Sequence, residues 1–433
     1  MKNYRFLIPI ILVILFATSI YVLYDANATE EQTYQQYLAE ARKYRAMEIY
    51  VDAEAYYAKA LDMRPSLELY KEIGELYDLM GSQRKILDWG EEIVDAYPEA
   101  AEGYEILIRT SLAKEDYVTC YEWYDAAQKR NVTSSYISNA MQSIEWTYYL
   151  TDRYDEALIY SEGFCPVADE GLWGFANVDG DNQVSCKYQK VGVFSGGVAP
   201  VVDADGNAYY IDSKGNKKFV ILNVENVTEL GVMINGIYAL YNGTSWGFYN
   251  KDYEYLFGGY DETSALGNGY AAARIGNQWQ LIDATGTAIT DDTFDSVVQD
   301  EKTVVYRNDR FFVEKNAQYY MMDTSGNCIN QTAYQNADLF NNATYAAVMI
   351  NGLWGFVDKD GKIVIEPQYQ EAKSFSNGLA AVKINGKWGY IDESGELVIE
   401  ASFEDANDFN DHGGAFVFDG KYWKLLCLYK MNH

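Results

Sequence analysis

Two consecutive stretches near the C-terminus of this chain have closely similar sequences. Residues Gly352–Asn385 and the 34 residues that follow them agree at 11 of 34 positions when they are aligned without gaps. Many other positions are close exchanges, such as Phe356 for Tyr390. A period of this length is typical of repeat proteins, in which each unit is too small to bury its own apolar face and packs on its neighbours. The period therefore predicts a repeat architecture for this part of the chain.

The repeat extends upstream as a frame in which an aromatic residue is followed, four residues later, by Asp or Asn. The last position of the frame falls at residues 177, 212, 250, 283, 323, 358, 392 and 427, with steps of 35, 38, 33, 40, 35, 34 and 35 residues. The aromatic positions are Trp173, Trp246, Trp279, Tyr319, Trp354 and Trp388, and the Asp positions are Asp212, Asp283, Asp323, Asp358 and Asp392. Two copies are decayed: Ala208 replaces the aromatic residue before Asp212, and Cys427 replaces the Asp after Trp423.

Each frame has the sequence of a short strand followed by a hairpin turn. The residues after the aromatic position alternate and are rich in aromatic and β-branched side chains, which favours a strand. Asp-x-x-Gly, as in Asp358–Gly361, suits a type I turn whose Gly supplies the left-handed residue. The Trp occupies one fixed place in every unit, which indicates packing between units. We therefore predict structural roles for these aromatic and Asp positions, and the ligand-binding residues stay unassigned.

Residues Gly386–Asp392, Ser394-Gly395 and Val398-Ile399, with the matching set between residues 352 and 367, resemble the WG-repeat family, also called KWG repeats. The resemblance covers roughly residues 168–433. It implies a bacterial, tandemly repeated and often surface-associated protein, and it implies an architecture without naming a reaction. The spacing leaves open whether the units close into a propeller, which would remove exposed strand edges, or form an open β-stack.

The region before the β-repeats has a different composition, with few Gly, many Ala, Glu, Leu and Tyr, and apolar residues at helical spacing. Tyr50–Pro65 has the small and aromatic residues of the second helix of a tetratricopeptide unit, and Gln83–Pro98 matches it 33 residues later. Tyr117 and Tyr154 continue the series at steps of 34 and 37 residues. We predict about four tetratricopeptide-like units, which would offer a concave surface to a peptide or protein partner.

The N-terminus carries an uncharged apolar run, Phe6–Tyr24, preceded by Lys2 and Arg5 and followed by Asp25. A helix of this length spans roughly 28 Å, close to the ~30 Å hydrocarbon thickness of a bilayer. The charge distribution predicts an N-terminus in the cytoplasm and a body outside the cell membrane. The alternative is a secreted protein, because Ala26-Asn-Ala28 resembles a signal-peptide cleavage site.

The predicted fold class is therefore a multi-domain chain with three parts. A signal-anchor transmembrane helix lies within residues 1–28, an all-α tetratricopeptide-like array covers residues 29–165, and an all-β WG-repeat domain of about seven or eight units covers residues 166–433.

Composition excludes several partners and chemistries. The formal net charge of −30 argues against nucleic acid as a partner. Only His412 and His433 could supply His-based catalysis or metal binding. The segment from Asn177 to Tyr188 resembles the start of a calcium loop but has Asn in place of Gly at the sixth position and Tyr in place of Glu at the twelfth, so a turn is favoured. We expect no enzyme, metal or cofactor site.

The five cysteines are odd in number and have no paired spacing, so a disulfide framework is not expected, although a Cys165–Cys186 bridge is conceivable. The first functional hypothesis is a membrane-anchored, extracytoplasmic, non-enzymatic scaffold that binds an unidentified protein or peptide. The alternative is a binder of cell-envelope glycan that uses exposed aromatic side chains, which make up 15% of the residues.

Overall fold

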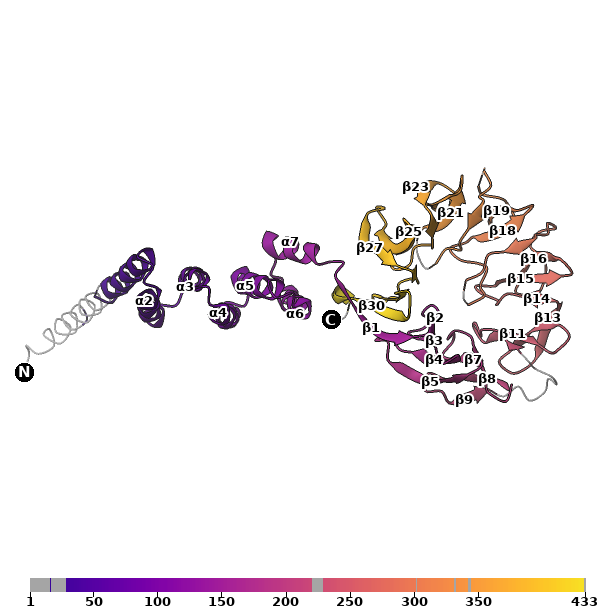
Figure 1. The fold of residues 1–433 in the computed structure, drawn as a ribbon, viewed down its shortest axis with the longest axis horizontal. Helices are drawn as coiled ribbons and strands as arrows, with labels where there is room; N and C mark the ends of the chain where they lie inside the picture. The colour runs from indigo at the N-terminus through magenta and orange to yellow at the C-terminus, as the bar shows by residue number, and fades with distance from the viewer. Residues whose placement is uncertain are drawn as a thin grey trace, which may run out of the picture. The chain divides into compact units, whose positions relative to one another are not determined.

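The structure is a computed structural model that describes residues 16, 29–219, 229–300, 302–330, 332–341 and 344–431. The chain divides into two compact units, one that ends at Glu145 and one that starts at Trp146 (Figure 1). The division lies N-terminal to the predicted boundary between residues 165 and 166. Each unit is described by itself.

The first unit is built of seven helices over the residues that the structure describes. The first covers residues 29–46. The others are α2 (Tyr50–Met63), α3 (Leu67–Met80), α4 (Gln83–Ala96), α5 (Ala101–Leu112), α6 (Tyr117–Gln128) and α7 (Ser135–Ser143). They form three consecutive helix pairs followed by α7. Tyr50–Met63 is the second helix of its pair, as the small-residue pattern predicts, and both Ala53 and Ala60 are fully buried in it.

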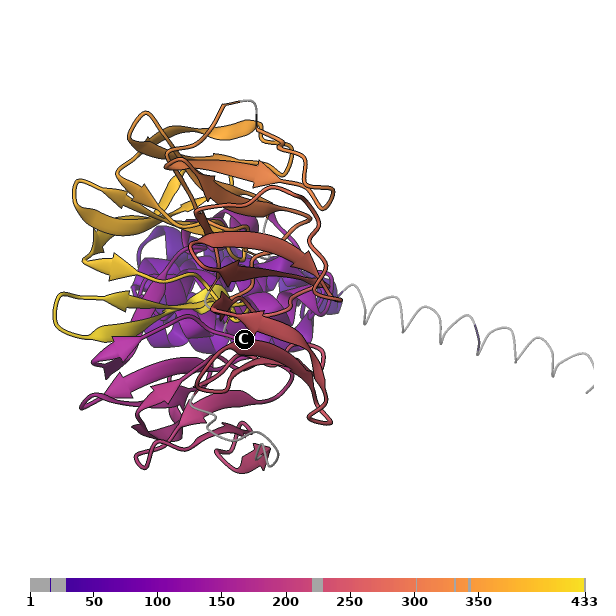
Figure 2. The ribbon, with the colours of Figure 1, turned by 90° about the vertical axis from the view of Figure 1, so that its right-hand side faces the viewer.

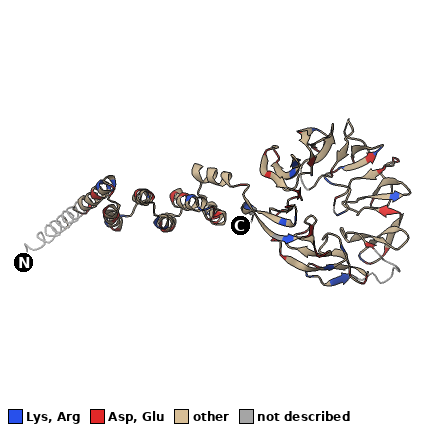
Figure 3. Ribbon diagram, viewed as in Figure 1, with Lys and Arg blue, Asp and Glu red and all other residues tan. Residues whose placement is uncertain are grey.

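Glycine sets the distance between α4 and α5. A Cβ on Gly90 would lie 2.8 Å from the side chain of Leu107, and a Cβ on Gly103 would lie 2.8 Å from the side chain of Val94. These two helices can pack this closely only because neither position carries a side chain. Ion pairs link the first helix of one pair to the first helix of the next pair. Examples are Arg45–Glu75 at 2.6 Å and Lys71–Glu102 at 2.6 Å. Figure 3 shows charged residues of both signs on these helices.

Two predictions for this part of the chain need correction. The fourth helical unit, predicted around Tyr154–Ala157, is absent because these residues lie in strands that belong to the second unit. The predicted fold class also included a transmembrane helix, and no helix among the described residues is long and apolar enough to cross a bilayer. The predicted span, residues 6–24, lies outside the described residues except for Phe16.

The second unit is an eight-bladed β-propeller, in which each blade is one antiparallel sheet (Figures 1 and 2). The first four sheets are β2–β5 (Glu156–Ala157, Cys165–Asp169, Leu172–Ala176, Asn182–Tyr188), β6–β9 (Lys190–Val191, Ala199–Val202, Ala208–Ile211, Lys217–Phe219), β10–β13 (Glu229–Leu230, Ile237–Tyr241, Trp246–Asn250, Tyr255–Tyr260) and β14–β16 (Glu262–Thr263, Tyr270–Ile275, Gln278–Asp283).

The other four are β17–β19 (Ser296–Val297, Phe311–Lys315, Gln318–Met322), β20–β23 (Asn336–Ala337, Ala346–Ile350, Leu353–Val357, Ile363–Tyr369), β24–β27 (Glu371–Ala372, Leu379–Ile384, Lys387–Asp392, Leu397–Phe403) and the sheet β1-β30-β29-β28 (Tyr148–Tyr154, Trp423–Leu428, Gly414–Phe418, Asp405–Ala406).

The ring is closed by a blade made from both ends of the unit. Strand β1 pairs antiparallel with β30, so that Leu150 faces Leu426. Each of the eight boundaries between neighbouring blades holds a cluster of buried apolar side chains. The cluster that includes Val167 and Phe416 joins the first complete blade to the last one. An open β-stack would leave this boundary exposed, so the alternative that the spacing left open is resolved in favour of a propeller.

The Gly of the Trp-Gly pair allows the outer strand of a blade to approach. A Cβ on Gly355 would lie 2.6 Å from the carbonyl oxygen of Ile365, at a point where the pairing of β22 with β23 shifts register. The four blades whose frame reads Trp-Gly have outer strands of six or seven residues. Where Gln280 or Tyr320 replaces that Gly, the described residues form a sheet of only three strands.

Candidate functional site

The repeated aromatic side chains lie inside the propeller. Trp279, Trp354 and Trp388 retain 8%, 8% and 5% of their exposure, while the other three, Trp173, Trp246 and Tyr319, are half-buried. Trp354 lies in the apolar cluster that joins the β20–β23 blade to the β24–β27 blade. The rings of Trp279, Trp354 and Trp388 therefore contribute to packing between blades.

The repeated Asp side chains close the turns that follow the third strands of their blades. In each case Oδ1 accepts hydrogen bonds from the backbone N–H groups two and four residues later. The same arrangement holds for Asp212, Asp283, Asp323, Asp358 and Asp392. In the calcium-like segment, Asn177 accepts from Asp179 and Asp181 in the same way. The described residues contain no cluster of His, Cys, Asp or Glu that could hold a metal ion. All five cysteines are free thiols, so Cys165 and Cys186 are not bridged.

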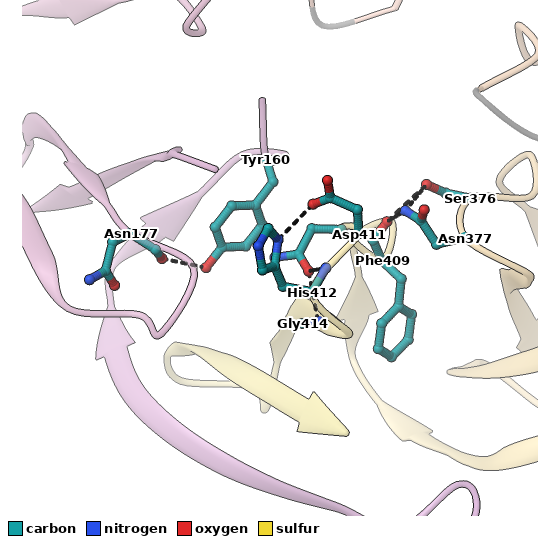
Figure 4. Close-up of polar contacts among 9 residues, drawn as sticks. Tyr160, Asn177, Ser376, Asn377, Phe409, Asp411, His412 and Gly414 are labelled. Atoms are coloured by element: carbon teal, nitrogen blue, oxygen red, sulfur yellow. Dashed lines mark hydrogen bonds and ion pairs between the residues drawn. The ribbon is translucent and has the colours of Figure 1, made fainter. Parts of the chain in front are cut away.

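A cavity of about 300 Å³ lies where the inner ends of five blades meet, and we call it the central cavity. Its walls are the segments that connect the first and second strands of those blades. Its polar lining consists of Tyr160, Ser161, Glu162, Asp300, Lys302, Arg307, Asn341, Ser376, Asn377, Asp408, Asn410, Asp411 and His412. Figure 4 shows several of these side chains, contributed by the first blade and by the last two blades of the chain.

The walls of the central cavity are held by hydrogen bonds from one blade to the next. Ser376 Oγ and Asn377 Nδ2 donate to the carbonyl oxygen of Phe409 at 2.8 and 2.7 Å (Figure 4). Ser161 Oγ donates to the carbonyl oxygen of Phe194 in the equivalent place. Asn377 has a φ of 51° and the following Gly378 a φ of 81°, which is the backbone of a tight hairpin turn. The inner turns are therefore ordered around the cavity.

One wall of the central cavity comes from an insertion into the repeat. The longest repeat step, 40 residues, leads from Asp283 to Asp323, and its extra residues lie between β17 and β18. Arg307 donates through Nε and Nη2 to Asp300 Oδ2 at 3.0 and 2.5 Å. Lys302 is half-buried beside this pair. The pKa of Lys302 is lowered by burial and by the charge of Arg307, against the opposing effect of Asp300 and Glu162.

The acidic groups of the central cavity accept hydrogen bonds from the protein itself. Glu162 accepts from the backbone N–H groups of Gly196 and Gly197 at 2.7 and 2.9 Å. Asp408 Oδ2 accepts from Asn341 Nδ2 at 2.7 Å. Each of these contacts joins two blades, so these carboxylates also tie the ring together.

Tyr160 and His412 complete this side of the cavity. Tyr160 donates its hydroxyl to the carbonyl oxygen of Asn177 at 3.0 Å, and burial raises its pKa well above the usual value (Figure 4). Asp411 Oδ1 lies 2.8 Å from Nδ1 of His412, and both side chains are exposed (Figure 4). A ligand in the cavity would therefore meet carboxylate, amide, imidazole and ammonium groups on one rim.

The helical unit has a second hollow, a groove of about 400 Å³ between α3, α5 and α7. It is lined by Lys71, Gly74, Glu75, Asp78, Ile93, Glu102, Glu105, Ile106, Arg109 and Tyr136. Arg109 Nη2 contacts both carboxylate oxygens of Asp78 at 2.8 Å. Tyr136 is 38% exposed. Acidic residues outnumber basic ones in this groove.

Of the residues that line the two hollows, the sequence pointed only to His412, as one of two histidines in the chain. Lys302 and Arg307 belong to no motif, and the only sequence signal for them is the long repeat step that contains them. Tyr136 lies in α7, outside the helical repeat. The repeated residues that the sequence did single out, such as Trp354 and Asp392, lie in neither the central cavity nor the helical groove.

The family model described as "WG containing repeat" matches residues 173–205, 354–388 and 388–423. Three segments of the propeller carry this repeat. They include the frames of Trp173, Trp354 and Trp388. The two matches between residues 354 and 423 cover the pair of similar stretches near the C-terminus from which the repeat was recognised. No curated protein matches the chain.

Several solved structures resemble the chain at low sequence identity. The computationally designed Ika8 protein is 11% identical, with 64% of this chain and 98% of that chain covered and a TM-score of 0.44. BamB from Moraxella catarrhalis is 10% identical, with 65% and 100% covered and a TM-score of 0.41. Hsv2 from Kluyveromyces marxianus is 11% identical, with 56% and 93% covered and a TM-score of 0.37. Similarity at this level says nothing about function.

Proposed function

We propose that this protein is a non-enzymatic scaffold that binds another protein. The observation that carries the proposal is that the residues that stabilise the fold are different from those that line its hollows. The repeated Trp and Asp side chains are occupied by packing and by hairpin turns, as Trp388 and Asp392 illustrate. Residues that differ between copies, such as Lys302 and Arg307, line the central cavity. A repeat fold suits binding when its repeated residues stabilise the fold and its variable residues lie at a surface where they can contact a partner.

The helical groove is the proposed site for the protein partner. Tyr136 offers an exposed ring beside the apolar side chain of Ile106, and aromatic anchors of this kind dominate the energetics of many interfaces. Glu105 forms no ion pair in the part of the chain that the structure describes, whereas Lys71 and Arg109 are paired with acids. The groove therefore favours a segment of the partner that carries a basic side chain next to an apolar one.

The experiment is affinity capture with the whole protein, followed by titration calorimetry with the captured partner. We expect Tyr136→Ala and Glu105→Lys each to weaken binding by ten-fold or more. Glu115→Lys is the matched control, because it makes the same charge change on the same unit outside the groove, and it should leave the affinity unchanged. A partner whose affinity none of these variants alters would contradict the proposed site.

A glycan of the cell envelope is the second candidate ligand. The observation in its favour is the rim of the central cavity, where Asn341, Asn377, Asp411 and His412 lie near Tyr160. Burial of Trp279, Trp354 and Trp388 counts against it, because the strongest sugar-stacking side chains are removed from the surface. Retention of the protein on purified cell wall, without capture of any protein, would favour the glycan and overturn the scaffold.

Location outside the cytoplasm remains a prediction from the N-terminal sequence, and we retain it as a proposal. Fractionation of the producing cell with an antibody against the propeller tests it. Recovery of the protein in the cytoplasmic fraction would contradict it.

A further inference from the structure

We propose that the central cavity binds a carboxylate through Lys302, with Arg307 beside it. The proposal concerns a site in the propeller and does not depend on the groove of the helical unit. It rests on the position of Lys302, on the state of the neighbouring acids and on the size of the cavity.

Lys302 is a half-buried cation without a direct counter-ion. Its Nζ makes no hydrogen bond and no ion pair within 4.0 Å in the described ranges of the chain. A lysine side chain that is partly removed from water without a partner is unfavourable, because its charge loses hydration. Arg307 adds repulsion, and burial and Arg307 together lower the pKa of Lys302. An anion in the cavity would relieve both effects.

The nearby acids are engaged elsewhere. Asp300 accepts from Nε and Nη2 of Arg307, and its other oxygen accepts from the backbone N–H of Val304 at 2.8 Å. Glu162 accepts from two backbone N–H groups of the next blade. The ammonium group of Lys302 is therefore the donor that an incoming acceptor can reach without displacing a contact of the ring.

The remaining lining limits what the ligand can be. Glu162, Asp300, Asp408 and Asp411 also face the cavity, so a ligand with several negative charges would be repelled. A volume of about 300 Å³ is at the lower end of the range for small-molecule sites. The ligand class is a small organic acid, or one acidic side chain of a partner, whose other groups hydrogen-bond to Asn341 and Asn377.

Titration calorimetry of the whole protein with four probes tests this site. The probes are lactate, its neutral amide, and the peptides Gly-Glu-Gly and Gly-Gln-Gly with acetylated N-termini and amidated C-termini, so that each acid carries one carboxylate and each amide carries none. We expect saturable binding of at least one acid and of neither amide. A free organic acid is indicated if lactate binds more tightly, and a partner's side chain if the Glu peptide does.

Variants separate binding from folding. Lys302→Met should weaken binding of the acid ten-fold or more and should keep or raise the melting temperature, because it removes a cation without a counter-ion. Lys302→Arg should retain part of the binding. Lys214→Met, in an exposed hairpin, is the matched control and should change nothing. Absence of saturable binding by both acids, equal binding of acid and amide, or an unchanged affinity in Lys302→Met would overturn the proposal.

Discussion

Gly355 and Ile365 lie so close together that a Cβ on Gly355 would be 2.6 Å from the carbonyl oxygen of Ile365. The same relation recurs between Gly389 and Ile399, at 2.5 Å. A fourth strand can therefore pair along the third strand of the blade, with the bulge at this point. The Gly of the Trp-Gly pair is explained by this contact, and the Trp by packing between blades.

Substitution of Gly355 by Ala should destabilise the propeller. The methyl group cannot avoid the backbone of β23, and the free energy of unfolding should fall by about 2 kcal/mol or more. Gln280→Ala is the matched control, since Gln280 occupies the same position in a blade without a fourth strand, and it should stay within about 0.5 kcal/mol. Chemical denaturation of both variants measures the difference. Equal stability of the two would refute this explanation.

The helical unit provides a second comparison of two glycines. Gly90→Ala should destabilise it by about 1–3 kcal/mol, because a Cβ would meet the side chain of Leu107 at 2.8 Å. Gly74→Ala should be neutral or stabilising by up to about 1 kcal/mol, because its nearest contacts are at 3.5 Å and Ala favours a helix. Helix content followed by circular dichroism during denaturation reports both values. The reverse order would show that α4 and α5 are spaced differently.

Acid should destabilise the hairpins of the propeller. Hydrogen bonds from Lys424 and from the backbone of Tyr422 and Lys421 lower the pKa of Asp419 to about 2. Hydrogen bonds from the side chain and backbone of Thr285 lower the pKa of Asp283. A carboxyl whose pKa is lower in the folded state stabilises the fold above its unfolded pKa of about 3.9, and this contribution is lost as the pH falls through the folded value.

The melting temperature should therefore fall between about pH 4 and pH 2. Asp419→Asn, which cannot titrate, should show a smaller fall over that range than the unchanged protein. Identical pH profiles for the two proteins would mean that this hydrogen-bonded carboxylate does not contribute to the acid response.

The cysteines should differ in reactivity, although all five are free. Cys120, Cys165 and Cys427 are buried, and burial raises the pKa of Cys165 well above its usual value. Cys328 is exposed. A thiol reagent should modify Cys328 first in the native protein and all five after unfolding, because a buried thiol is both shielded and protonated. Loss of the fast phase in Cys328→Ser confirms the assignment; early modification of Cys165 would contradict the described core.

The architecture of the second unit could largely be predicted, because its information is local. Each Trp-to-Asp frame encodes one strand and one turn, and eight frames became the third strands of eight blades. Ring closure could not be predicted from spacing, since it depends on pairing between Leu150 and Leu426, which are far apart in the sequence. For the same reason Tyr154 and Ala157 were predicted to be helical. Their apolar pattern is compatible with a helix or a strand, and pairing with β30 and β3 makes them strands.

The candidate sites could not be predicted from the sequence for a related reason. Lys302, Asn341 and Asp408 come from three blades, and nothing in one unit indicates that they share a cavity. Repetition marks the residues that every unit needs, whereas a binding site uses residues that occur once. Only the 40-residue step to Asp323 indicated an insertion. That the inserted residues line the central cavity follows only from the closed ring of blades.

The most direct test of the scaffold is hydrogen–deuterium exchange of the whole protein with and without its captured partner. We expect slower exchange in α3, α5 and α7 around Glu105 and Tyr136, with the third strands and Asp hairpins of the blades unchanged. Protection confined to the Trp-Gly strands and their hairpins, with the helical groove unaffected, would contradict it.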